Sequence, residues 1–256
     1  MVTDTEAIVL RQVKTMTSRR MIVLFSKKYG KISVGSSISE GGKNKSALIT
    51  RPFTYGRYEL FKGKDSYNLN SGQVLESFYG IGEDLDKYMQ ASYVLELTDR
   101  LIPDEVMQPR LFQALLDFLT ALEKRTKKVD TLVIAYMVKA LDMLGVMPVI
   151  NECAECGKTG CDRFFSVNSG GIICGECAKA LAENNPNSLI YDTNFGIINI
   201  LRYFQKEPFS SFEKIALDDT IAVKLKEILK KYMEYHLDIG ILKSEMLTVA
   251  DPSANE

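Results

Sequence analysis

Four cysteines form two pairs with the same internal spacing, Cys153-Ala-Glu-Cys156 and Cys174-Gly-Glu-Cys177, and seventeen residues separate the pairs. A C-x-x-C turn brings two thiolates to one side of a metal ion, and a second such turn completes a tetrahedron. The spacing therefore predicts a structural zinc site with these four ligands. Redox-active disulfides are the alternative interpretation. The fifth cysteine, Cys161, fits neither pair and is interpreted as a spare thiol in the intervening loop, with ligand exchange as its alternative.

A metal site with four cysteine ligands has no open position for water or substrate, so it favours an architectural role over catalysis. Thiolates that bind a metal must stay reduced, which is typical of the cytoplasm. The sequence contains neither a secretory signal peptide nor an apolar run approaching about 20 residues. These features predict a cytoplasmic protein without a membrane span.

Catalytic constellations are poorly supported by the sequence. The chain has one histidine, His236, which is expected near the end of a helix, where packing or a surface role is favoured over acid–base chemistry. One such histidine does not support a Ser-His-Asp or Cys-His arrangement. The adjacent Asp218 and Asp219 are expected to cap a helix. Residues 35–42 lack the order of a phosphate-binding loop. The sequence therefore predicts a protein that is not an enzyme.

The elements that would position the cysteines follow from the hydrophobic periodicity. The first 80 residues alternate short β-branched runs with turns, a pattern typical of a small closed barrel such as the OB-fold. The expected strands are residues 6–13, 21–25, 31–34, 53–61 and 66–70, with a polar, flexible stretch at 35–46.

From residue 83 the period becomes helical. The expected helices are residues 85–97, 111–122, 131–144, 193–205 and 221–237, with a short helix beginning at the second cysteine pair. The sequence thus predicts an α+β chain: an OB-fold at 1–80, then a helical domain at 81–256 with a zinc-binding insertion at about 150–180. Residues 251–256 are expected to fray.

The net charge of −1 conceals an asymmetry. Residues 1–80 contain thirteen Lys and Arg against six Asp and Glu, a balance of +7, whereas residues 81–256 contain nineteen against twenty-seven, a balance of −8. A basic domain on an otherwise acidic protein suggests contact with a polyanion. The alternatives are chance, or a basic face that docks on the acidic half.

Ten cations of the basic domain lie near strand ends, turns or the polar stretch, where a groove could follow phosphates. These candidate DNA-binding residues are Arg11, Lys14, Arg19, Arg20, Lys27, Lys28, Lys31, Lys43, Lys45 and Arg51. Phe53, Tyr55 and Tyr58 are candidate stacking platforms for bases, although strand alternation favours core packing for any one of them.

In the order of these parts, the chain resembles the RecO family of bacterial DNA repair and recombination mediators. The strand, basic turn and hairpin at 6–33 and the later strands at 52–78 are similar to the family's barrel. The cysteine pairs in their helical context at 153–178 are similar to its zinc knuckle. The segment 230–247 resembles the family's closing helix.

The resemblance implies an OB-fold, a helical domain and a zinc-binding insertion. It implies binding to single- and double-stranded DNA, annealing of complementary strands, and loading of RecA onto strands coated by the single-strand-binding protein. The implied partners are RecR and the acidic C-terminal tail of the single-strand-binding protein, and the implied location is cytoplasmic and nucleoid-associated. A pocket for that tail is expected in the helical domain, where Arg202 is a candidate partner-binding residue.

One segment departs from the family pattern. Relatives commonly carry a dense run of Arg and Lys in the loop after the second hairpin strand, whereas residues 35–45 contain two lysines and Glu40. This difference predicts weaker DNA binding, or greater reliance on Arg19, Arg20, Lys27 and Lys28. Two rival functions stay open: a zinc-stabilised protein-interaction scaffold in which DNA contact is incidental, and a zinc-dependent nucleic-acid enzyme, which would need an open metal position.

Overall fold

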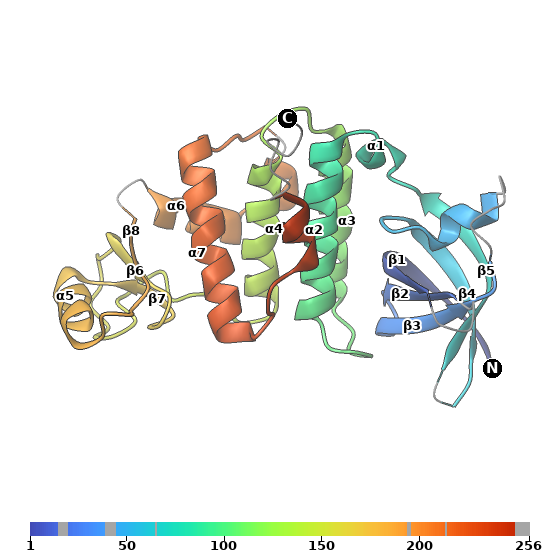
Figure 1. The fold of residues 1–256 in the computed structure, drawn as a ribbon, viewed down its shortest axis with the longest axis horizontal. Helices are drawn as coiled ribbons and strands as arrows, with labels where there is room; N and C mark the ends of the chain where they lie inside the picture. Colours follow the sequence, from blue (N-terminus) through green and yellow to red (C-terminus); the bar gives the residue numbers. More distant parts are fainter. Residues whose placement is uncertain (15–19, 39–44, 65, 194–195, 213, 249–256) are drawn as a thin grey trace, which may run out of the picture. The chain divides into compact units, whose positions relative to one another are not determined.

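The computed structural model describes residues 1–256 except 15–19, 39–44, 65, 194–195, 213 and 249–256. The chain divides into two compact units, Met1–Lys124 with Ile241–Glu256, and Arg125–Gly240. Figure 1 shows the strand-rich N-terminal part and the helices that follow it along the chain. The predicted fold class, a small β-barrel followed by a helical domain, is confirmed.

Five strands of the first unit close into a barrel with the order β1-β2-β3-β5-β4. The strands are β1 (Val2–Lys14), β2 (Arg20–Ser26), β3 (Gly30–Ser36), β4 (Tyr55–Lys62) and β5 (Tyr67–Glu76). Neighbouring strands are antiparallel except for a short parallel contact between β3 and β5. A five-stranded closed barrel is the architecture expected of an OB-fold.

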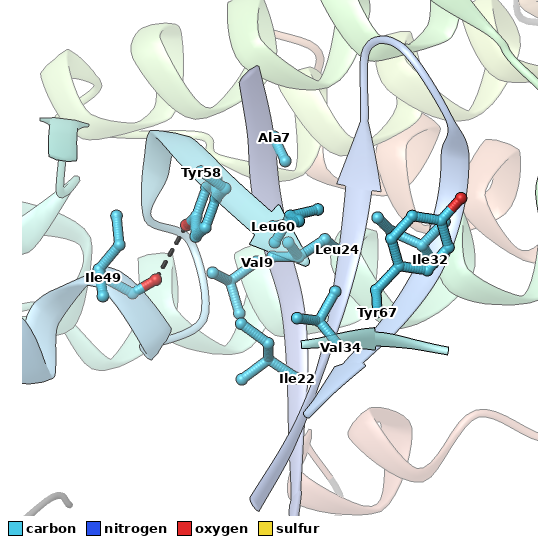
Figure 2. Packing of buried hydrophobic residues seen from close by; sticks show 10 residues of the cluster. All are labelled: Ala7, Val9, Ile22, Leu24, Ile32, Val34, Ile49, Tyr58, Leu60 and Tyr67. Atoms are coloured by element: carbon cyan, nitrogen blue, oxygen red, sulfur yellow. Dashed lines mark hydrogen bonds between the residues drawn. The ribbon is translucent and has the colours of Figure 1, made fainter. Parts of the chain in front are cut away.

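The barrel core consists of the inward side chains of alternate strand positions (Figure 2). Among them, Tyr58 is fully buried and its hydroxyl donates a hydrogen bond to the carbonyl of Ile49 at 2.9 Å. Ile49 lies on a 3-10 helix, η1 (Lys45–Thr50), and its side chain leaves no room for a Cβ at Gly56 or Gly72. The helix η1 therefore packs against the barrel through the side chain of Ile49. This packing requires glycine at positions 56 and 72 of the facing strands.

Two of the expected strands differ in extent from the structure. The first is longer than predicted and contains a bulge between Val9 and Arg11. The fourth begins only at Tyr55 because Phe53 has a φ of 74°, a left-handed conformation incompatible with a strand. The polar stretch at 35–46 begins within β3 and ends within η1, and its residues 39–44 lie outside the described part.

Three helices complete most of the first unit. They are α1 (Tyr79–Gly82), α2 (Leu85–Leu101) and α3 (Pro109–Lys124). The Asp84 carboxylate caps α2 by accepting a hydrogen bond from the amide of Lys87. Phe112 of α3 packs edge-on against Phe25 of β2, with ring centroids 5.5 Å apart. The outer face of β2 is therefore covered by α3 at Phe25.

The second unit combines helices with a small sheet. Its elements are α4 (Asp130–Met143), β6 (Phe164–Ser166), β7 (Gly171–Ile173), α5 (Gly175–Asn184), β8 (Ile190–Asp192), α6 (Ile197–Lys206), η2 (Phe209–Phe212) and α7 (Asp219–Leu237). Residues 131–141 of α4 are all buried, so α4 is the central helix of this unit. Gly145 follows the last turn of α4 with a φ of 73°, the left-handed conformation that glycine adopts at helix ends. The sheet, ordered β7-β6-β8, was not predicted from the sequence.

The last described segment returns to the first unit as η3 (Lys243–Thr248). The carboxylate of Glu96 on α2 accepts hydrogen bonds from the amides of Lys243 and Ser244 at 2.9 and 2.8 Å. Burial opposes ionisation of Glu96, but these amides outweigh it and lower the pKa of the carboxyl group. In the described part of the chain, no helix is long and apolar enough to cross a membrane.

We expect Tyr58→Phe to lower the free energy of unfolding by about 1–3 kcal/mol, because it leaves the buried Ile49 carbonyl without its donor. Urea unfolding would measure the change. The matched control is Tyr79→Phe, since Tyr79 is 64% exposed, and it should stay within about 0.5 kcal/mol of wild type. Equal effects of the two substitutions would contradict the role of the Tyr58 hydroxyl.

We expect Glu96→Gln to destabilise the protein at pH 7 and to matter progressively less in acid. Because folding lowers the pKa of Glu96, its contribution is present above the unfolded-state value and is lost as pH falls through the folded-state value. Urea unfolding of both proteins at pH 7 and at about pH 3 would test this. A stability difference that does not shrink in acid would show that the Glu96 charge is not responsible.

Candidate metal centre and nucleic-acid interface

The four predicted cysteine ligands come together in the second unit. Cys153 and Cys156 lie on the loop that follows α4, whereas Cys174 is the N-cap residue of α5 and Cys177 lies in its first turn. Their sulfur atoms all lie within 4.8 Å of one another, and those of Cys156 and Cys174 are 3.8 Å apart. Sulfurs at about 2.3 Å from a tetrahedral zinc would be separated by about 3.8 Å. The cluster could therefore hold a metal ion.

Backbone amides turn toward the sulfur of Cys153. The amide of Cys174 donates to this sulfur at 3.3 Å. Burial opposes ionisation of Cys153, but amides of Cys156, Cys174 and Glu155 outweigh it and lower the pKa of the thiol to about 6. Such amides are the outer-shell donors that orient thiolate ligands. Gly157, with a φ of 73°, makes the turn after the first pair possible.

The small sheet holds the first cysteine loop against the second. The amide of Ala154 donates to the carbonyl of Ile172 on β7 at 2.8 Å. A Cβ at Gly171 would lie 2.2 Å from the carbonyl oxygen of Val149, so only glycine permits this approach. Cys161 packs beside the cluster, but its sulfur donates to the carbonyl of Lys158 and is not one of the four gathered sulfurs.

The single histidine packs against its neighbours at the end of α7. A ring nitrogen of His236, Nε2, lies 2.7 Å from the carbonyl oxygen of Val167, and its ring contacts that of Tyr232. The carboxylate of Asp218 accepts a hydrogen bond from the amide of Thr220 and caps the same helix, as predicted. These contacts give both residues a structural role.

Two predicted DNA-binding cations pair with the carboxylate of Asp99, which is only 11% exposed, although the side chain of Arg11 itself is 51% exposed. Nε of Arg11 donates to this carboxylate at 2.6 Å. The side chain of Lys31 is 16% exposed, and its Nζ lies 3.6 Å from the same carboxylate and 3.3 Å from that of Asp104. The same Nζ donates a hydrogen bond to the backbone carbonyl of Asp99. Contact of these two residues with DNA stays a prediction.

The turn between β2 and β3 carries two other predicted cations, Lys27 and Lys28, both exposed. Nζ of Lys27 lies 3.3 Å from the carboxylate of Glu6. The hydroxyl of Tyr55, and then Lys27 and Arg57, outweigh burial and lower the pKa of Glu6. This turn therefore contains one cation paired with a carboxylate and one, Lys28, that contacts the hydroxyl of Thr3 at 3.3 Å.

The remaining predicted cations are placed as follows. Arg20 is half-buried at the start of β2, and Arg51 is exposed after η1. Arg19 and Lys43 lie outside the described residues, as do the side chains of Lys14 and Lys45. Their DNA contacts likewise stay predictions.

The candidate stacking aromatics are packed instead. Tyr58 is in the barrel core, Phe53 is buried edge-on against Tyr88, and Tyr55 donates a hydrogen bond to Glu6 and packs on Phe112. The packing interpretation that strand alternation favoured therefore describes all three. Arg202, the candidate partner-binding residue, is half-buried and donates to the carbonyl of Ile150 and the side-chain oxygen of Asn199. Its contact with a partner stays a prediction.

Sequence reasoning missed a second cluster of cations and rings. Nζ of Lys62, at the end of β4, lies 5.1 Å from the ring centroid of Tyr29 and 5.4 Å from that of Tyr67. Lys28 approaches the same Tyr29 ring at 5.3 Å. The Lys62-Gly-Lys64 turn was recognisable in the sequence, but its proximity to the hairpin turn depends on barrel closure.

Comparisons with known proteins identify the family. A family model described as Recombination protein O N terminal matches residues 1–78, and one described as Recombination protein O C terminal matches residues 82–246. The chain is 30% identical to the DNA repair protein RecO of Alkaliphilus metalliredigens, over 93% of this chain and 95% of that protein. It is 28% identical to the DNA repair protein RecO of Bacillus subtilis, over 96% and 94% respectively. The chain belongs to the RecO family of DNA repair proteins.

Proposed function

We propose that this protein is a non-catalytic DNA repair and recombination mediator. Its barrel binds single- and double-stranded DNA, and the protein anneals complementary strands. With RecR as its partner, it helps to load RecA onto DNA coated by the single-strand-binding protein, whose acidic tail it also binds. The observation that carries the proposal is membership of the RecO family together with a barrel that exposes cations at its turns. We propose a cytoplasmic, nucleoid-associated location for this role.

The physical basis of annealing is charge neutralisation. Two complementary strands repel each other through their phosphates, and cations that bind both strands lower this repulsion. The excess of positive charge in residues 1–80 supports this mechanism, and the exposed Lys27 and Lys28 supply part of it. The remaining helical part of the chain is available for protein partners.

For the metal, we propose one structural zinc ion held by Cys153, Cys156, Cys174 and Cys177. Four thiolates are the donor set that structural zinc prefers, and the 3.8 Å sulfur separation supports a tetrahedral site. Four protein ligands would complete the coordination sphere of the ion. The metal would then stabilise the fold and would not bind a substrate.

The DNA-binding proposal predicts a steep dependence on salt. Titration of labelled single-stranded DNA should show affinity falling by about 300-fold or more between roughly 50 and 200 mM salt, if six or more phosphates are contacted. Changing Arg19, Arg20, Lys27 and Lys28 together to Ala should reduce both this dependence and the rate of strand annealing. The control changes Lys124, Lys179 and Lys206 to Gln, three exposed lysines elsewhere.

If the variant with all four residues changed to Ala is folded and anneals strands as fast as wild type, the proposed role of these cations is wrong. A DNA affinity that does not change with salt concentration would instead favour the rival function, a protein-interaction scaffold in which DNA contact is incidental.

The zinc proposal predicts that replacing one of the four ligand cysteines removes the metal, whereas replacing Cys161 does not. Wild-type protein should contain one zinc per chain, and Cys174→Ser should lose it and destabilise the second unit by about 3 kcal/mol or more, because metal-binding energy becomes folding energy. Metal analysis and thermal unfolding would measure both. The matched control is Cys161→Ser, which should keep the metal. Pure protein without metal and with oxidised thiols would refute the proposal.

A further inference from the structure

Two turns of the barrel meet at one of its ends, which we call the turn end and define as residues 27–29 and 62–64. The amide of Lys27 donates to the carbonyl of Glu6, and β4 ends opposite the start of β1, with Phe61 paired to Val2. Antiparallel pairing thus brings the β2–β3 turn and the end of β4 to the same edge. Its four exposed cations are Lys27, Lys28, Lys62 and Lys64.

The ring of Tyr29 organises two of these cations. Its hydroxyl lies 2.5 Å from that of Thr3, which fixes the ring, and the ammonium groups of Lys28 and Lys62 lie 5.3 and 5.1 Å from its centroid. The ring of Tyr29 therefore attracts both ammonium groups through its π electrons. The hydrogen bond to Thr3, and then the charges of Lys28 and Lys62, outweigh burial and lower the pKa of Tyr29.

Carboxylates neutralise this end incompletely. Lys27 pairs with Glu6, but among the described residues no carboxylate lies within ion-pair distance of Lys28, Lys62 or Lys64. The carboxylate of Glu105 acts on Lys62 only from farther away, and Asp65 lies outside the described part. The turn end thus differs from Arg11 and Lys31, whose charges are already satisfied by Asp99 and Asp104.

We propose that the turn end is a phosphate-binding site for a single DNA strand, in which Lys28, Lys62 and Lys64 neutralise neighbouring phosphates. The inference rests on the proposed function and locates it at one end of the barrel. A single strand suits the site because its flexible backbone can bring phosphates to ammonium groups gathered around one ring, whereas a stiff duplex fixes their spacing. Two lysines already positioned by Tyr29 lose less side-chain entropy on binding.

The test is a titration with a thymidine homopolymer of about 16 nucleotides, an upper site size for one OB-fold. Changing Lys28, Lys62 and Lys64 together to Gln should flatten the logarithmic salt slope by about 2, since each lost single-strand contact removes about 0.7. The control variant, with Lys124, Lys179 and Lys206 changed to Gln, alters the total charge equally and should keep the wild-type slope. Thermal unfolding of both variants checks the fold.

The outcomes separate the inference from the proposed function. If wild-type protein shows no salt-dependent binding, the proposed function fails. If wild type binds but the Lys28, Lys62 and Lys64 variant keeps its slope, the turn-end site is refuted and DNA binding elsewhere stands. A duplex of equal length should lose less of its slope in this variant, and an equal loss would refute the single-strand preference.

A second pair of variants tests the ring. Tyr29→Phe keeps the aromatic face and should retain wild-type affinity for the homopolymer, whereas Tyr29→Leu should weaken it by about threefold to tenfold, because two cation–π contacts are lost. Equal affinities of the two folded variants would show that Tyr29 does not position the lysines for binding.

Discussion

The arrangement of the first unit depends on one nearly buried carboxylate, that of Asp99. A carboxylate removed from water must be paired, or it destabilises the fold or loses its charge. Here Arg11 and Lys31 of the barrel supply the pairing, and Lys31 also donates to the Asp99 carbonyl. These contacts fasten β1 and β3 to α2 and simultaneously use two of the barrel's cations. The requirement to satisfy Asp99 therefore influences which positive charges remain for a ligand.

The second unit faces a different constraint, because the module around the cysteines has little core of its own. Among the described residues, its fully buried cluster consists of Cys153, Ile173, Cys174 and Ala178, with partly buried hydrophobic side chains packed against it, and its strands are three residues long. Elements this short do not bury enough apolar surface to offset the entropy of ordering the chain. A metal cross-link between the two cysteine turns would supply the missing stability, which agrees with the closed ligand set.

Sequence patterns predicted the elements that long runs of periodic residues determine. The barrel, most helices and the gathering of the cysteines follow from local spacing, as does the cap at Asp218. The missed features depend on distant partners. The side chain of Ile49 seals the barrel only because Gly56 and Gly72 lie opposite, and three-residue strands such as β6 are too short to show alternation.

The same limitation applies to the cations of the candidate interface. Lys28 and Lys31 are three residues apart and of the same type, yet one contacts a tyrosine ring at the surface and the other pairs with carboxylates. The partners of Lys31 come from α2 and the loop beyond it, far along the sequence. An excess of +7 in residues 1–80 therefore overstates the positive charge that is available to a ligand. The structure of the closed barrel is needed to distinguish the lysines that pair with carboxylates and stabilise the fold from the lysines that could contact phosphate.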